Sequence, residues 1–321
     1  AILFGTACMG AVKYVPENMK VELSLKVPGN NAVNYKLHPD KLENSYFDYE
    51  WRSDNKLPIT VFHKVEERDS CMRLTVQLTA AQDVYFNYRQ LLSTGYRHDN
   101  CQFYMPGFWY RRNLRSPKKA PSFHTSDSWL VREDRLSAPL TGIFSEKEKR
   151  FMTVNRLDDF SMDALATHKE GEIILSGKTS LGFTGFENQQ GIAMLSFGFP
   201  YREAPKSYIR KLTLAPEVEA FQLMKKGESV LLTWEIMESG ADDFSDFIQH
   251  TWEHCYDTYA PKPVENSYSI ADMKQVLSCF FVNSLVDNQP LVYNSGIHLK
   301  VSDCERNGQA EVGFIGRVLL N

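Results

Sequence analysis

The chain has 321 residues, of which 43% are hydrophobic and 24% are charged, a composition typical of a folded globular protein and not of a disordered one. Its formal net charge of −4 offers no general attraction to phosphates, so no nucleic-acid partner is expected. The longest apolar stretches, residues 1–12 and 276–286, fall short of the ~18 residues needed to cross a bilayer, so no membrane span is predicted.

Strands dominate the first 240 residues, where apolar and polar side chains alternate with a period of two. Residues 21–27 put the apolar side chains on one face and the polar ones on the other, as in a strand with one solvated side. Similar patterns predict strands at 72–78, 140–144, 150–157, 172–177, 192–199, 207–214, 219–224 and 229–237. Polar turns separate them, including a hairpin turn at 225–228 in which Gly227 would supply a positive φ. The sequence therefore predicts a mainly β fold, a large antiparallel β-sandwich followed by a small α-helical region.

The hydrophobic period changes near residue 242. Apolar residues recur there at three- and four-residue spacing, acidic residues come first and Pro261 follows, which is typical of an amphipathic helix. A second helical stripe contains Ile270, Met273, Val276, Leu277, Phe280 and Phe281. We therefore expect a β-sandwich domain at 1–240, a linker helix at 241–263 and a helical region at 264–321.

Both ends of the sequence bear on its organisation. Residues 308–321 have the pattern of a third helix that has only begun, so the sequence is expected to be a truncated part of a longer protein. The first residues lack the basic region of a signal peptide, so a signal has either been removed or was never there.

Several familiar kinds of site have no motif in this sequence. The six cysteines are widely spaced, with no Cys-x-x-Cys pair and no cysteine–histidine cluster with zinc-finger spacing, which favours small buried apolar residues over zinc ligands. The GKTS at 177–180 lacks the spacing of a phosphate loop, and no G-x-S-x-G, H-E-x-x-H or G-x-G-x-x-G occurs. We expect no metal site and no cofactor.

One segment, residues 103–136, departs from the alternation. Residues 101–135 carry seven Lys or Arg and three acids, a local net charge of +4. Pro106, Gly107, Pro117 and Pro121 predict a largely irregular loop, and a long irregular loop in a compact domain is usually functional. Sugar rings stack on aromatic faces, and charged groups satisfy their hydroxyls. The segment thus predicts a carbohydrate-binding surface made by Trp109, Tyr110, Arg111, Arg112, His124, Asp127 and Trp129.

A structural interpretation of the same segment stays open. Its aromatic side chains could plug the end of the sandwich, because large aromatic residues dominate cores and interfaces alike. Within residues 131–136, a buried Arg–Asp pair that fixes the loop is favoured over a ligand role, since unpaired buried charges are costly. The catalytic residues stay unknown, because no pair with a distinctive spacing occurs among the carboxylates considered for glycoside hydrolysis, Asp158, Asp159, Asp303, Glu305 and Glu311.

The order of these parts resembles the N-terminal region of large bacterial six-hairpin glycosidases. VREDRLSAP at 131–139 and EVGFIGRVLLN at 311–321 look like such proteins, in which a β-supersandwich similar to galactose mutarotase precedes linker helices and an (α/α)6 catalytic barrel. The resemblance implies a supersandwich at 1–240 and the first barrel helices at 269–287 and 310–321. It also implies an oligosaccharide or polysaccharide ligand and a periplasmic or extracellular location. The general acid and base would lie in the barrel, so these residues alone are not expected to be catalytically complete.

Three functions are therefore considered. The first is the sandwich region of a glycoside-hydrolase-like enzyme of carbohydrate metabolism, in which residues 103–136 bind substrate or dock on a downstream helical domain. The second is a stand-alone carbohydrate-binding or adhesion module. The third is a protein-interaction β-sandwich with no sugar ligand.

Overall fold

The structure, a computed structural model, describes residues 15–68, 71–114, 120–158, 170–210, 213–262, 268–284, 293–294 and 310–311. Within these ranges the fold is mainly β, as predicted, with two α-helices toward the C-terminal side. The chain divides into two compact units, one that ends at Thr258 and one that begins at Tyr259.

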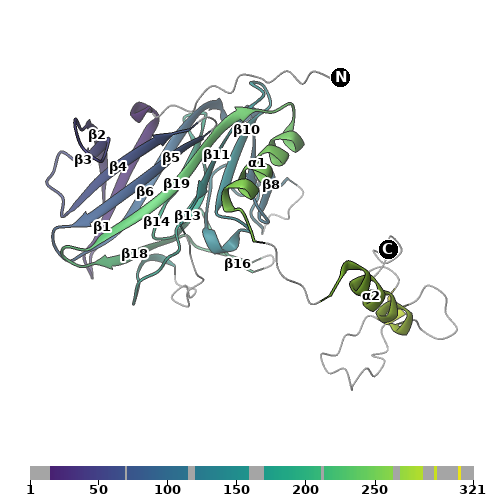
Figure 1. Cartoon of the computed structure of the whole chain (residues 1–321). Coiled ribbons are helices and arrows are strands. Elements are labelled where there is room, and N and C mark those ends of the chain that lie inside the picture. Colours follow the sequence, from purple (N-terminus) through teal and green to yellow (C-terminus); the bar gives the residue numbers. More distant parts are fainter. Residues whose placement is uncertain are drawn as a thin grey trace. The chain divides into compact units, whose positions relative to one another are not determined.

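The first sheet of the larger unit is built around the long strand β6 (Val84–Arg97) (Figure 1). Its antiparallel order is β2 (Val33–Lys41), β1 (Met19–Lys26), β6, β14 (Ile192–Phe199), β13 (Phe183–Gln189) and β9 (Trp129–Arg132). The beginning of β6 also pairs with β18 (Val218–Met224), which is flanked in turn by the parallel strand β12 (Gly171–Ile174) and by β15 (Arg202–Glu203).

The second sheet is also antiparallel and starts where the first one ends, since β2 pairs with β1 on one side and with β3 on the other. Its order is β3 (Tyr49–Arg52), β4 (Ile59–Glu67), β5 (Cys71–Ala80), β19 (Ser229–Gly240), β11 (Arg150–Arg156), β10 (Leu140–Ser145), β7 (Cys101–Met105) and β8 (Trp109–Arg111). Among the described strands, β8 therefore lies at the edge of this sheet, whereas β3 lies between β2 and β4.

The core lies between the two sheets. The Tyr88 ring of the first sheet stacks on Trp234 of the second at 6.4 Å between centroids, and Phe186 stacks on Phe103 at 4.0 Å. Alternation along each strand aims every second side chain into this layer, which is the pattern predicted for the sandwich.

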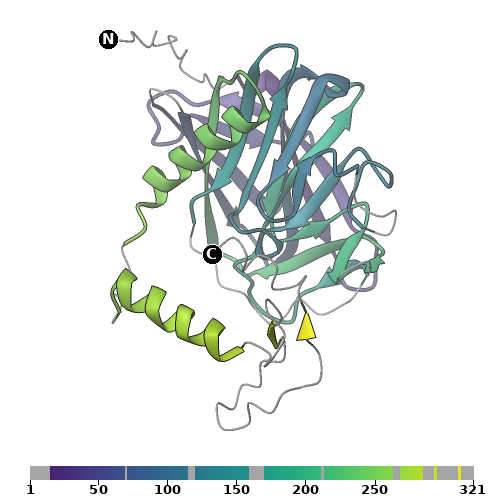
Figure 2. The same cartoon turned by 90° about the vertical axis from the view of Figure 1, so that its right-hand side faces the viewer.

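Helix α1 (Phe244–Tyr259) covers part of the outer face of the second sheet (Figures 1 and 2). On the neighbouring strands β10 and β11, Ile143 and Val154 point into the core, whereas Phe144 and Phe151 point outward. Phe247 of α1 packs on the two outward rings, at 6.0 and 4.9 Å between centroids. The helix begins after Asp243, whose carboxylate accepts hydrogen bonds from two free N–H groups of the first turn.

Two predicted connections differ in the structure. Gly227 has the expected positive φ of 82° in a tight turn, but β18 and β19 on either side belong to different sheets, so the turn is not a hairpin. The strand predicted at 207–214 is instead a small hairpin of β16 (Ser207–Arg210) and β17 (Thr213–Ala215). Alternation along the sequence does not distinguish these arrangements, because pairing partners are chosen in tertiary structure.

The smaller unit contains helix α2 (Ile270–Ser284), close to its predicted range. Ser269 and Asp272 cap its start reciprocally, each accepting a hydrogen bond from the backbone N–H of the other. Ala310 and Glu311, predicted to open a third helix, form strand β21 (Ala310–Glu311), paired with β20 (Tyr293–Asn294). The remainder of that predicted helix, residues 312–321, lies outside the described residues.

Candidate functional site

The segment predicted as an irregular loop, residues 103–136, carries more regular structure than expected. β7 and β8 form a hairpin around Pro106 and Gly107, β9 follows, and a 3-10 turn occupies Glu133–Arg135. Gly107 has a φ of 76°, and a Cβ there would come within 2.5 Å of the Ser137 hydroxyl oxygen. Proline and glycine thus mark the hairpin turn itself and do not prevent the strands on either side.

The two tryptophans of this segment belong to the core. Trp109 is 0% exposed and packs against Trp129 and Phe186, at 5.7 and 5.1 Å between ring centroids. The indole N–H of Trp109 donates to the Arg111 carbonyl, and that of Trp129 donates to the Ser126 carbonyl. Neither ring presents a face on which a sugar could stack, because both strands turn these side chains toward the opposite sheet. For these two residues the structure favours the plug interpretation.

Alternation along β8 turns the next side chain outward. Tyr110 is 51% exposed and lies at the edge of the second sheet, where β8 has β7 as its neighbour among the described strands. Its ring is 5.5 Å from that of Tyr104, and its hydroxyl accepts a hydrogen bond from the Gly107 backbone N–H. Asn113 accepts from the Tyr110 backbone N–H and donates to the Pro121 carbonyl, so the turn after β8 is held on both sides.

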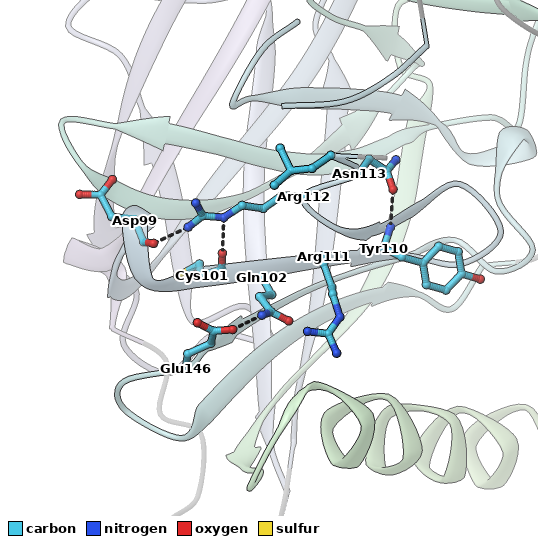
Figure 3. A pocket seen from close by; sticks show the side chains of 9 residues that line it. Asp99, Cys101, Gln102, Tyr110, Arg111, Arg112, Asn113 and Glu146 are labelled. Atoms are coloured by element: carbon cyan, nitrogen blue, oxygen red, sulfur yellow. Dashed lines mark hydrogen bonds between the residues drawn. The ribbon is translucent and has the colours of Figure 1, made fainter. Parts of the chain in front are cut away.

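An open groove of about 830 Å³ runs beside Tyr110 (Figure 3). Three of the predicted site residues line it, Tyr110, Arg111 and Arg112. The other lining residues come from β7 and its surroundings, Asp99, Cys101, Gln102, Asn113, Leu114 and Glu146. Figure 3 shows the Tyr110 ring at one end of the groove and Asp99 toward the other, with Arg111 and Arg112 pointing in different directions between them.

The two arginines have different environments. Arg112 is fixed to the main chain, since its guanidinium donates to the carbonyls of Asp99 and Cys101 and lies 5.3 Å from the centre of the Phe123 ring. The Arg111 guanidinium lies 4.9 Å from the centre of the Phe244 ring, at the first turn of α1. Arg112 thus shapes the groove, whereas Arg111 places a cation at its boundary with α1.

The remaining predicted residues do not line this groove. His124 donates from Nε2 to the Leu114 carbonyl at 2.9 Å and so holds the end of the turn. The Asp127 carboxylate accepts from Asn188 at 2.7 Å, and its carbonyl faces His98 Nε2 at 3.0 Å. The structure therefore brings three of the seven predicted residues together in the groove.

Asp99, Gln102 and Glu146 also line the groove, although no pattern in the sequence points to them. The Gln102 amide donates to the Glu146 carboxylate across the pairing of β7 with β10. The two partners are 44 positions apart in the sequence, and no motif links them. The pair could be predicted only from the register of β7 with β10, which is set by the tertiary structure.

The buried Arg–Asp pair predicted within residues 131–136 is present. Arg132 binds Asp134 through two parallel hydrogen bonds of 2.5 and 2.7 Å, and both side chains are buried. Its neighbour Glu133 is fully buried and accepts from Arg156 and from the Gly182 N–H, each at 2.7 Å. Burial raises the pKa of Glu133, and Arg156 opposes that rise. These charges anchor the region where β9, β11 and β13 meet, so their role here is structural.

The carboxylates considered for hydrolysis are mostly outside the described residues, namely Asp159, Asp303 and Glu305, while for Glu311 only the backbone is described. Asp158 accepts from Arg156 at 3.1 Å and from the Thr233 N–H at 2.8 Å, which ties it to β19.

Among the described residues, no helix is long and apolar enough to span a membrane.

Comparison with known proteins finds no match to a family model and no match to a curated protein. Among solved structures, a polysaccharide lyase is 12% identical with a TM-score of 0.34, over 73% of this chain and 27% of that one. A galactose mutarotase-like protein from Clostridium acetobutylicum is 9% identical with a TM-score of 0.30, over 67% of this chain and 65% of that one. A Synechocystis protein is 7% identical with a TM-score of 0.34, over 67% of this chain and 73% of that one. The chain thus spans about a quarter of the length of the lyase, and likenesses at these levels establish no family for it.

Proposed function

We propose that this chain is the N-terminal sandwich region of a glycoside-hydrolase-like enzyme and that the groove beside Tyr110 binds an oligosaccharide or polysaccharide. The observation that carries the proposal is the exposed Tyr110 ring at the mouth of a groove that also contains Arg111 and the carboxylates of Asp99 and Glu146. An aromatic face packs on the apolar side of a sugar ring, and charged and amide groups bind its hydroxyls. The order of sandwich, linker helix and further helix agrees with the resemblance to six-hairpin glycosidases.

Binding to soluble polysaccharides tests this proposal directly. The chain is run in native gels that contain one neutral or acidic polysaccharide each, and the affinity for those that retard it is measured by calorimetry. We expect Tyr110→Ala to weaken binding about tenfold, which corresponds to about 1.4 kcal/mol. Tyr46→Ala is the matched control, because Tyr46 is exposed and precedes β3, at the other end of the strand order of this sheet. Equal losses in the two variants, or no retardation by any polysaccharide, would contradict a sugar site in this groove.

A second role for the same segment is packing against the linker helix α1, which is distinct from docking on a downstream helical domain, and two contacts support it. Arg111 lies over the Phe244 ring, and the Trp252 indole donates to the Tyr104 hydroxyl at 2.7 Å. Both contacts join the end of the sandwich to α1, the predicted linker helix. Arg52→Gln is the control, because Arg52 is an exposed arginine of β3. This second role is favoured if Tyr110→Ala leaves sugar binding unchanged and Arg111→Gln lowers the melting temperature more than Arg52→Gln does.

A periplasmic or extracellular location goes with the proposed function, because polysaccharides are too large to reach an enzyme inside the cell. Fractionation of cells that produce the protein tests it. Recovery in the periplasm or the medium is expected, and recovery in the cytoplasm alone would contradict it.

A further inference from the structure

Three side chains of metal-ligating types meet on the outer face of the second sheet, under α1. Cys71 is the first residue of β5, Glu235 lies on β19, and His254 lies on α1. Their sulfur, carboxylate oxygen and imidazole nitrogen atoms all lie within 4.8 Å of one another. The three residues come from three different elements of the larger unit, far apart in sequence.

The fold brings these residues together through strand register. Cys71 pairs with Met237 and Arg73 pairs with Glu235, so Cys71 and Glu235 are diagonal neighbours on one face of the sheet. Phe247, packed on Phe144 and Phe151, fixes α1 above that face. His254 is seven positions further along α1, which is about two helical turns, and therefore projects from the same side of the helix.

The geometry of the cluster suits a small divalent metal ion. In a tetrahedral zinc site the metal lies about 2.0 to 2.3 Å from its ligands, so the ligand atoms lie about 3.3 to 3.8 Å apart. Here His254 Nε2 and Glu235 Oε1 are joined by a hydrogen bond of 2.7 Å. Since no pair exceeds 4.8 Å, every separation between ligand atoms lies within about 1 Å of the tetrahedral range.

The surroundings also fit a metal site. Cys71 is 5% exposed and Glu235 is 4% exposed, while His254 is half-buried and leaves a path from solvent. The Thr258 hydroxyl donates to Glu235 Oε1 at 3.1 Å, the kind of outer contact that orients a ligating carboxylate. Arg73 Nη2 forms an ion pair of 3.8 Å with the other carboxylate oxygen, which leaves Oε1 on the side of His254. A thiolate and a carboxylate together would balance the two charges of the metal ion.

We propose that Cys71, Glu235 and His254 form a zinc-class metal site, with a water molecule in the fourth position. Thiolate, imidazole and carboxylate are ligands that zinc accepts together. On binding, the Cys71 thiol releases its proton to solvent, and the hydrogen that His254 Nε2 shares with Glu235 moves to Nδ1, so that the sulfur, Nε2 and the carboxylate oxygen are free to bind the ion. Because the ligands come from both the sheet and the helix, the metal ion would clasp α1 to the sandwich. The site is separate from the sugar groove and does not depend on the proposed function.

Metal binding is measured on the purified chain after treatment with a chelator. Equilibrium dialysis against Zn²⁺ is expected to give one tightly bound ion per chain and a higher melting temperature. Cys71→Ser and His254→Gln should each weaken that binding about a hundredfold or more. The matched controls are Cys279→Ser, an exposed thiol on α2, and His250→Gln, one turn earlier on α1, which should change the affinity less than about twofold.

Cobalt provides a test that needs no variant and so does not depend on how a variant folds. With Co²⁺ in place of Zn²⁺, a thiolate ligand gives a charge-transfer band in the near ultraviolet, and tetrahedral coordination gives strong visible bands. We expect both on the wild-type chain, and Zn²⁺ should remove them. Stoichiometric binding without the thiolate band, no binding above background, or equal losses in the His250 and His254 variants would overturn the proposal.

Discussion

The indole rings of Trp109 and Trp129 pack against each other inside the sandwich, 5.7 Å apart between centroids and inclined at 44°. One comes from β8 of the second sheet and the other from β9 of the first, so this pair closes one end of the core. The surface of the segment is left to Tyr110 and the two arginines that follow it.

Replacement of Trp109 by alanine is expected to destabilise the fold strongly. A fully buried tryptophan removed from a packed core costs about 3 to 5 kcal/mol, because the surrounding rings cannot fill the cavity. Urea unfolding followed by fluorescence and circular dichroism measures the change. Tyr110→Ala, one residue further along β8, should cost less than about 1 kcal/mol. Similar losses in the two variants would contradict the burial of Trp109.

Stability is expected to fall with acid through His63. This imidazole is fully buried, its Nε2 is 2.9 Å from the Tyr88 hydroxyl, and burial lowers its pKa from 6.5 to about 3. The unfolded chain therefore takes up the proton first. The contribution of neutral His63 is complete above about pH 6.5 and is lost as the pH falls toward 3, at about 1.4 kcal/mol per pH unit.

The comparison with His63→Gln isolates this effect, because glutamine does not titrate. Between pH 7 and pH 5 the wild-type chain should lose about 2 kcal/mol more of its free energy of unfolding than the variant does. Urea unfolding at the two pH values measures the difference. Equal pH dependence in both chains would show that His63 does not titrate as its burial implies.

The buried pair of Arg132 and Asp134 provides a third prediction. Arg132→Met leaves the Asp134 carboxylate buried without its bidentate partner, and such a loss costs about 3 to 5 kcal/mol. The double variant Arg132→Met/Asp134→Leu removes both charges and should recover most of that stability. Urea midpoints of the four chains in this cycle give the coupling energy. A double variant no more stable than Arg132→Met would mean that packing, and not charge, explains the loss.

Thiol labelling distinguishes the described cysteines. Burial raises the pKa of Cys71 to about 11 and those of Cys101 and Cys255 to about 12, so little thiolate is present at neutral pH. Cys279 on α2 is exposed. With iodoacetamide followed by peptide mapping, we expect Cys279 to react at least ten times faster than the other three. In urea the four rates should converge, and a buried cysteine that reacts as fast as Cys279 in the native chain would contradict this order.

Local pattern alone predicted much of the architecture. The alternation at 72–78, 140–144 and 192–199 corresponds to β5, β10 and β14, and the three- and four-residue spacing after 242 corresponds to α1. These predictions hold because a half-buried strand and an amphipathic helix each require one apolar face. That face appears in the sequence as a regular spacing of apolar residues. The Arg132–Asp134 pair could also be predicted from the sequence, because its two members are two residues apart.

Which aromatic residues reach the surface depended on the tertiary structure. Trp109 and Tyr110 have similar local chemistry, but β8 is seated on the sheet so that the first points into the core and the second toward the groove. The sequence does not show which of the two is buried. Alternation along a strand implies only that neighbouring side chains face opposite sides of the sheet. The same holds for β18 and β19. The sequence predicts the turn between them, but not that the two strands belong to different sheets.

By itself the sequence determined the mainly β class, the change to helix near residue 242 and the ion pair between near neighbours, because each depends on residues close together in the chain. Tertiary structure decided where distant residues meet. It placed Gln102 beside Glu146, and it gathered Cys71, Glu235 and His254 although the cysteines and histidines are scattered along the sequence. Such meetings are set by strand register and by how a helix lies on a sheet, and these depend on the packing of the whole core.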